Sequence, residues 1–134
     1  MGVSVTWDNV EQTALCYTVT GRWTWAEFFV ARDQARQLAD SVGQASVNSI
    51  IDVRAGSLFP QNALLHLRRM PADAHPKLKF GTVIIVENNL FVRSLMDIMR
   101  RVKPDEMRKF HSARTLEQAH ELMRKLETPL PVAV

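Results

Sequence analysis

Asp52 is the acidic residue of this sequence that is best placed to do chemistry. Residues 47–53 have the pattern of a parallel strand, and open α/β sheets bind ligands at the carboxyl ends of such strands. A carboxylate at that edge can contribute to a Mg²⁺ site, but one carboxylate alone binds this ion poorly. The earlier strand is followed by residues 21–23, none of which is acidic. We therefore expect Asp52 either to pair with Arg54 or to accept N–H bonds from the loop that follows.

The other side chains with chemical potential are scattered along the chain. The four histidines form no HxxxH, HxH or Cys/His pair, so no metal site is predicted. The lone Cys16 alternates with apolar neighbours in a strand pattern, which is typical of an inert, buried thiol. The five glycines are too dispersed for a phosphate-binding loop of the GxGxxG or GxxxxGKS/T type. The sequence therefore predicts no cofactor and a protein that is not an enzyme.

Length and composition favour one small domain that spans residues 1–134. Of the 134 residues, 46% are hydrophobic and 23% are charged, as in an average globular domain. Residues 128–134, with two prolines, are expected to form a frayed tail. A single cysteine suits a reducing compartment, and the chain shows neither an apolar run of ~18 residues nor a signal peptide. We therefore expect a cytoplasmic protein without integral membrane contact.

The charge is distributed unevenly between the two halves of the chain. Residues 1–67 carry four basic and six acidic side chains, whereas residues 68–134 carry thirteen basic and eight acidic ones. An excess of this kind can indicate an anionic partner. Here, acidic residues are interspersed with the basic ones on predicted helix faces, and no aromatic residues alternate with them. We therefore interpret them as a solvated surface and expect no nucleic-acid partner.

Hydrophobic periodicity predicts the elements that must position these residues. Alternation in 3–7 and 15–19 indicates two antiparallel strands at the start of the chain. Thr24 and Glu27 have the spacing of a capping box that begins a helix, and Gly43 fits a left-handed stop just past its end. The later elements are a strand at 47–53, a helix at 61–70, a strand at 83–86, a helix at 90–103, an edge strand at 107–111 and a helix at 115–126. The order ββαβαβαβα implies an α/β fold with a mixed, largely parallel sheet and helices packed on it.

Three local patterns accompany this order of elements. The first is Ser49-Ile50-Ile51-Asp52-Val53, which leads through Phe59 into the second helix. The second is Thr82-Val83-Ile84-Ile85-Val86-Glu87-Asn88-Asn89, which enters the third helix through Leu90 and Phe91. The third is Arg108-Lys109-Phe110, followed by the capped helix at 115–126. Together with the length of the chain, these patterns resemble the STAS domain, in particular the SpoIIAA-like family of small bacterial proteins.

The resemblance implies a regulatory or protein-interaction module without enzymatic activity. Family members similar to the anti-sigma-factor antagonists are switched by phosphorylation of a serine in an Asp-Ser-Ser-Gly-like turn before the second helix. That turn falls on residues 60–63 here, so the phosphoacceptor position is Gln61 or Asn62, and neither side chain has a hydroxyl group. The serine switch is therefore expected to be absent. The loop expected to meet a protein partner contains Asp52, Ser57, Gln61 and Asn62.

The first helix offers a candidate interaction surface. Its predicted core stripe consists of Phe28, Ala31, Ala35, Leu38 and Val42. At about 100° per residue, Trp25 and Phe29 lie off this stripe as neighbours at i and i+4, with Arg36 near the same side. Aromatic residues and arginine are enriched at protein interfaces. Two alternatives stand: a homodimer that buries this patch, or cover by the N-terminal strands or the tail.

The third helix suggests a second function. Its apolar residues, from Phe91 to Val102, form a stripe wider than packing on a sheet requires. Packing in the core is the favoured interpretation of this stripe, but its methionines also suit an adaptable contact or the wall of a cavity. The alternative to an interaction module is therefore a carrier of a small apolar ligand or lipid, bound between this helix and the sheet.

Overall fold

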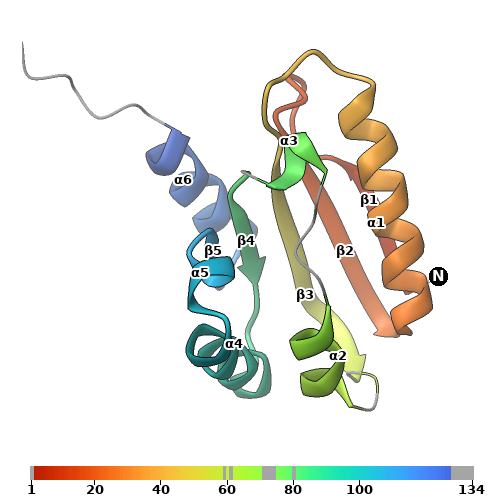
Figure 1. Ribbon diagram of the computed structural model, residues 1–134, viewed down its shortest axis with the longest axis vertical. Helices are drawn as coiled ribbons and strands as arrows, with labels where there is room; N and C mark the ends of the chain where they lie inside the picture. Colours follow the sequence, from red (N-terminus) through yellow and green to blue (C-terminus); the bar gives the residue numbers. More distant parts are fainter. Residues whose placement is uncertain (1, 59, 61, 71–74, 80, 128–134) are drawn as a thin grey trace, which may run out of the picture.

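The computed structural model describes residues 2–58, 60, 62–70, 75–79 and 81–127 (Figure 1). Gln61 and the expected tail at 128–134 lie outside the described residues. The elements are β1 (Val3–Trp7), β2 (Ala14–Arg22), α1 (Trp25–Asp40), β3 (Asn48–Leu58), α2 (Ala63–Arg69), α3 (Pro76–Lys79), β4 (Val83–Val86), α4 (Leu90–Val102), α5 (Pro104–Met107), β5 (Phe110–Ala113) and α6 (Leu116–Glu127). The predicted α/β class is confirmed, and two short helices, α3 and α5, extend the predicted order.

The five strands form one mixed sheet in the order β1-β2-β3-β4-β5. β1 is antiparallel to β2, and all other neighbouring strands are parallel. The predicted antiparallel start and the edge position of the last strand are therefore confirmed. The predicted bounds of that strand, 107–111, are wrong, because Met107 ends α5 and β5 begins at Phe110. β3 continues to Leu58, beyond the predicted end at residue 53, because β2 runs beside it until Arg22 pairs with Leu58.

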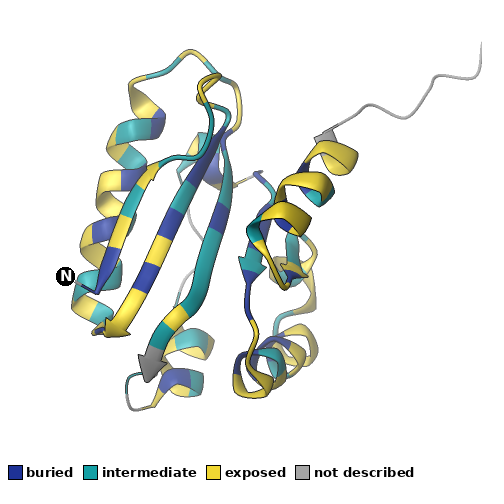
Figure 2. Ribbon diagram, turned by 180° about the vertical axis from the view of Figure 1, so that it is seen from behind, coloured by how far each residue is buried: buried dark blue, intermediate teal, exposed yellow. Residues whose placement is uncertain are grey.

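The helices divide unequally between the two faces of the sheet. Because successive parallel strands lie next to each other in chain order, right-handed crossovers place α1, α2 and α4 on the same face. Figures 1 and 2 show these three helices on one side and α6 on the other. α6 packs on β4 and β5, whereas exposed and buried residues alternate along β1 and β2 (Figure 2).

Alternation along the strands supplies a separate core to each face of the sheet. The core beneath α1 contains the buried residues Val3, Leu15, Tyr17, Val19, Trp23, Ala31, Ala35, Ala39, Val47 and Leu78. The core beneath α6 contains Ile50, Ile84, Val86, Ala113, Ala119 and Met123. The predicted stripe of α1 is confirmed, since its two alanines are buried and its three larger residues pack against the same core.

Specific hydrogen bonds fix the start of α1. The Thr24 hydroxyl accepts the Glu27 N–H at 3.1 Å, and the Glu27 carboxylate accepts the Thr24 N–H at 3.1 Å, so the predicted capping box is confirmed. The same carboxylate accepts the Gly2 N–H at 2.7 Å, which ties α1 to the start of the sheet and lowers the pKa of Glu27.

The predicted stop of α1 at Gly43 is wrong. The right-handed Ser41 already closes the last turn, and the backbone of Gly43 is not left-handed.

Candidate functional site

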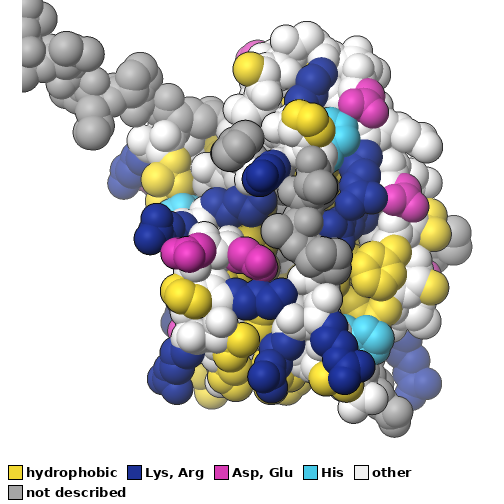
Figure 3. Space-filling view, in the orientation of Figure 1, with side chains coloured by type: hydrophobic (Ala, Val, Ile, Leu, Met, Phe, Trp, Pro, Cys, Tyr) yellow, Lys and Arg dark blue, Asp and Glu magenta, His cyan; other side chains and the backbone are white. Residues whose placement is uncertain are grey.

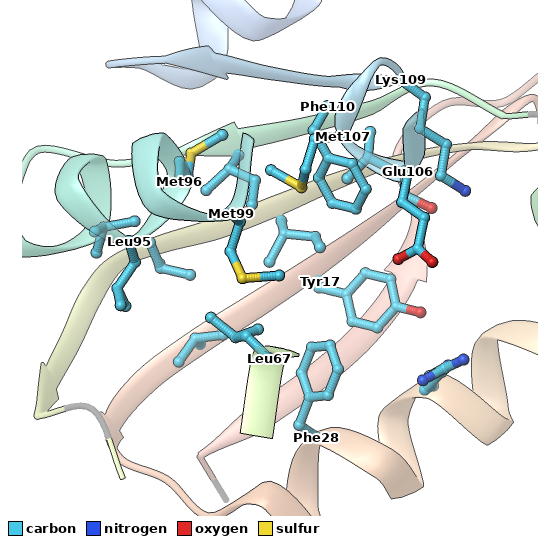
Figure 4. A pocket seen from close by; sticks show the side chains of 18 of the residues that line it. Tyr17, Phe28, Leu67, Leu95, Met96, Met99, Glu106, Met107, Lys109 and Phe110 are labelled. Atoms are coloured by element: carbon cyan, nitrogen blue, oxygen red, sulfur yellow. The ribbon is translucent and has the colours of Figure 1, made fainter. Parts of the chain in front are cut away.

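A cavity of about 610 Å³ lies between the sheet and the helices α1 and α4 (Figure 4). Its floor is formed by β2, β3 and β4, one wall by α1 and the other by α4. α2 contributes Leu67 to the lining, and residues of α3 and α5 line one end. The cavity therefore lies between the third predicted helix and the sheet, where the alternative of a small-molecule carrier required one.

Strand alternation supplies the floor of the cavity. Ser49, Ile51 and Val53 project into it from β3, while Ile50 faces the core beneath α6. The three floor residues span four residue steps, or about 13 Å at ~3.3 Å per residue. The floor therefore extends about this far along the strands.

The methionine-containing helix α4 forms one wall. Four of its buried residues line the cavity at helical spacing: Val92, Leu95, Met96 and Met99. Phe91, in contrast, is 50% exposed and does not belong to the lining. Methionine side chains are flexible and polarizable, so this wall can adapt to ligands of different shape.

Aromatic residues form the opposite wall. Trp23, Trp25 and Phe28 line the cavity, and the two indole rings meet edge to face with their centroids 5.0 Å apart. Trp25 also stacks on the imidazole ring of His66 in α2, with the centroids 5.1 Å apart. The prediction that Trp25 lies off the core beside Phe29 is therefore wrong, because α2 covers it. Trp25 packs against the core instead.

Phe29 and Arg36, the other two residues of the predicted interaction surface, lie on the outer side of α1. Phe29 is 39% exposed and touches the ring of Phe28, with the centroids 6.1 Å apart. Arg36 pairs with Asp33 at 3.2 Å on the helix surface. Their use as an interface stays a prediction.

One end of the cavity, next to α3 and α5, is polar. Arg32 of α1, Lys79 of α3 and Lys109, which precedes β5, belong to the lining. The Lys109 ammonium group donates to the backbone carbonyls of Leu78 at 3.3 Å and Lys79 at 3.1 Å. These bonds hold a cationic group at the junction of α3 and β5.

Asp52 lies on the opposite face of the sheet and is not part of the cavity lining. Its carboxylate accepts hydrogen bonds from Nε and Nη2 of Arg54 at 3.0 and 2.9 Å, and from the Arg54 backbone N–H at 3.1 Å. The hydrogen bonds from the Arg54 side chain lower the pKa of Asp52. The predicted Asp52–Arg54 pair is therefore confirmed, and it stabilises a charge within the strand.

The remaining residues of the predicted loop site do not gather around Asp52. Ser57 lies within β3, because the strand continues to Leu58. Asn62 is exposed at the start of α2, with a left-handed φ of 61° and no side-chain hydrogen bond that caps the helix. Gln61 lies outside the described residues. The loop therefore begins later along the chain than the sequence predicted.

Sequence reasoning missed Glu87, a charged residue that is only 2% exposed. It directly follows β4, accepts the Asn89 N–H at 3.0 Å and pairs with Nε of Arg93 at 3.4 Å. These bonds compensate the buried charge and attach the first turn of α4 to the end of β4. An acidic residue immediately after the apolar run 83–86 was the available signal.

The described residues contain no group of three or more His, Cys, Asp or Glu side chains that could hold a metal ion. None of the helices in this part of the chain combines the length and the apolar character needed to cross a bilayer.

No protein-family model matches the sequence, and no curated protein matches it either. The resemblance to the SpoIIAA-like family therefore stays a prediction, and the cavity is the main basis for a functional proposal.

Proposed function

We propose that this protein is a non-catalytic module that binds a small, largely apolar molecule between α4 and the sheet. The observation that carries the proposal is the cavity of about 610 Å³ with its mostly apolar lining. Small-molecule sites in proteins have volumes of ~300–1,000 Å³ and walls of this kind. A space of this size and lining is therefore suited to a small, largely apolar ligand.

The chemistry of the described lining supports binding rather than catalysis. It contains neither Cys nor His, and its two acidic residues, Asp105 and Glu106, are exposed on α5. Ser49, Tyr17 and the lysines of the described lining have no histidine beside them in it to act as a general base. The apolar floor and walls are suited instead to removing hydrocarbon surface from water.

Binding of n-alcohols of increasing chain length tests the proposal. Trp23 and Trp25 line the cavity and Trp7 does not, so a saturable change in tryptophan fluorescence reports occupancy. Each buried CH₂ group contributes about 0.8 kcal/mol, so we expect the affinity to rise about fourfold per CH₂ group until the cavity is filled. Absence of saturable binding at every chain length would contradict the proposal.

A substitution that fills the cavity provides the matched comparison. Ile51→Trp places a large ring on the floor, whereas Val30→Trp places the same ring at a position of α1 that is 57% exposed. By isothermal titration calorimetry, we expect Ile51→Trp to weaken binding about tenfold, equivalent to about two buried CH₂ groups, and Val30→Trp to leave it unchanged. Cooperative urea unfolding of both variants verifies that they fold. Equal affinities in the two variants would place the binding site elsewhere.

A protein-interaction role of the SpoIIAA-like type is the second candidate. It is favoured by Phe29 and Val30, neighbouring apolar side chains of α1 that are 39% and 57% exposed. In this proposal the protein is a cytoplasmic regulator that forms a homodimer through α1. The two candidates are compatible, because the cavity and the exposed residues lie on different sides of the helix.

A further inference from the structure

We infer that the ligand is a long-chain molecule with an anionic head group, such as a fatty acid, and that its head lies at the α3–α5 end of the cavity. This inference rests on the proposed function. It comes from the unequal distribution of apolar and charged side chains along the cavity (Figure 4).

The end of the cavity next to α2 is apolar. Val53 of the floor, Leu67 of α2 and Leu95 of α4 belong to this part of the lining, as do Trp23 and Trp25. Its polar atoms include the indole N–H groups of Trp23 and Trp25, but none of these lining residues is cationic. An ionised head group placed here would therefore lose its hydration without gaining a partner of opposite charge, at a high energetic cost. An alkyl chain would lose contact with water without losing a hydrogen bond. This end therefore suits the chain of the ligand.

The opposite end is lined by charged residues from several segments. Four are cationic and two are anionic: Arg32, Lys79, Arg108, Lys109, Asp105 and Glu106. Each of the two acids has a cationic partner, since Asp105 pairs with Arg108 at 3.3 Å and Glu106 pairs with Lys103 at 3.5 Å. Among the described residues that line this end, cations outnumber anions, so an anionic head group is favoured there over an ammonium group.

Lys109 and Tyr17 provide donors for the head group. Two backbone carbonyls, those of Leu78 and Lys79, orient the Lys109 ammonium group at this end of the cavity. Tyr17 rises from the floor, and Figure 4 shows its hydroxyl group directed toward the end at which Lys109 and Glu106 lie. Ammonium and guanidinium groups form short, charge-assisted hydrogen bonds with carboxylates and phosphates.

The surface around the cavity has the same sign of charge. Figure 3 shows Lys and Arg side chains spread over the face that carries α1 to α5, with fewer Asp and Glu side chains among them. The half of the chain that supplies α3, α4 and α5 has thirteen basic and eight acidic residues. A positive potential over this face raises the local concentration of anionic ligands.

Titration calorimetry with twelve-carbon amphiphiles below their micelle concentrations tests the inference. We expect dodecanoate to bind about tenfold more tightly than dodecanol, and dodecylammonium to bind most weakly. Added salt should weaken the binding of dodecanoate more than that of dodecanol, because it screens the charged contact. A further titration with dodecyl phosphate determines whether the preferred anionic head is a carboxylate or a phosphate.

Single-residue variants locate the head group. Lys109→Met keeps most of the side-chain length without the charge, and Lys125→Met is the matched control on α6, on the other face of the sheet. We expect Lys109→Met to abolish most of the preference for dodecanoate without changing the affinity for dodecanol, and Lys125→Met to retain that preference. Because Lys109 also attaches α3 to β5, Arg32→Met tests the same charge effect from α1.

The outcomes separate this inference from the proposed function. Equal affinities for dodecanoate and dodecanol, or tightest binding of dodecylammonium, would overturn the inference while the proposed function stands. An unchanged preference for dodecanoate in both Lys109→Met and Arg32→Met would also overturn it, because the head group would lie elsewhere. Failure of every amphiphile to bind would overturn the proposed function, and the inference with it.

Discussion

Gly81, which connects α3 to β4, has no room for a side chain. A Cβ atom added there would lie 2.0 Å from the Val47 carbonyl oxygen and 2.9 Å from the Val47 carbonyl carbon. Both atoms belong to the backbone, so no side-chain rotation relieves the contact. Real Cβ atoms essentially never approach closer than 3.0 Å, and Gly81→Ala therefore requires a displacement of about 1 Å.

The cost of Gly81→Ala follows from the hydrogen bonds on either side of this contact. The Val47 N–H donates to the Lys77 carbonyl at 2.9 Å, and the Ser49 N–H donates to the Thr82 carbonyl at 2.8 Å. A shift of about 1 Å would weaken one of these bonds, at about 1 kcal/mol, in addition to about 2 kcal/mol for overpacking. We expect the free energy of unfolding to fall by about 3 kcal/mol and Tm by about 10 °C.

Urea unfolding of Gly81→Ala beside Gly43→Ala measures this effect with a matched control. A Cβ atom at Gly43 would meet no atom within 4 Å, so we expect Gly43→Ala to leave stability unchanged or raise it by up to about 1 kcal/mol. A loss of less than about 0.5 kcal/mol in Gly81→Ala would refute the steric reasoning. If Gly43→Ala lowers the free energy of unfolding by more than about 1 kcal/mol, Gly43 adopts the left-handed conformation that the sequence predicted.

Three further substitutions test the start of α1, the strand ion pair and the exposed helix face. Thr24→Ala removes the acceptor of the Glu27 N–H, so we expect a loss of about 1 kcal/mol and a Tm lower by a few degrees in a thermal melt. Because Arg54 lowers the pKa of Asp52 from its ordinary value of 3.8, the stabilisation by this pair is fully present above pH 3.8 and is lost as the pH falls through the lower folded-state pKa. Wild type should therefore exceed Asp52→Asn in unfolding free energy by about 1 kcal/mol at pH 7, with a smaller difference in acid; a difference independent of pH would contradict the assignment. Phe29→Ser should shift a homodimer toward monomer in analytical ultracentrifugation without lowering the stability of the monomer, and an unchanged mass would argue against an interface at this residue.

Local sequence was sufficient to predict features that depend on neighbours within a few residues. The capping box of Thr24 with Glu27 and the pair of Asp52 with Arg54 join side chains two or three positions apart. The strand Val83–Val86 is a continuous β-branched run, and its predicted bounds are those of the structure. Such features form within one helical turn or along one strand, so spacing and alternation reveal them.

Pairing between elements changed the predictions that involved more distant partners. β3 extends to Leu58 because β2 lies alongside it, although residues 56–60 carry local signals that break a strand. Trp25 lines the cavity and His66 of α2 stacks on its ring, whereas a helical wheel of α1 alone places Trp25 off the core. A wheel describes the faces of one helix and contains no information about which element packs on each face.

Only the tertiary structure decided the composition of the polar end of the cavity. Arg32, Lys79 and Lys109 come from three segments that are far apart along the chain, and each is unremarkable within its own segment. Helical periodicity predicted the buried apolar face of α4 that forms one wall, because one face of one helix carries that signal. The convergence of the three cations depends on the strand order and on the crossovers that place α1, α3 and α5 on the same face of the sheet. That arrangement follows from the pairing of whole strands, which no local pattern encodes.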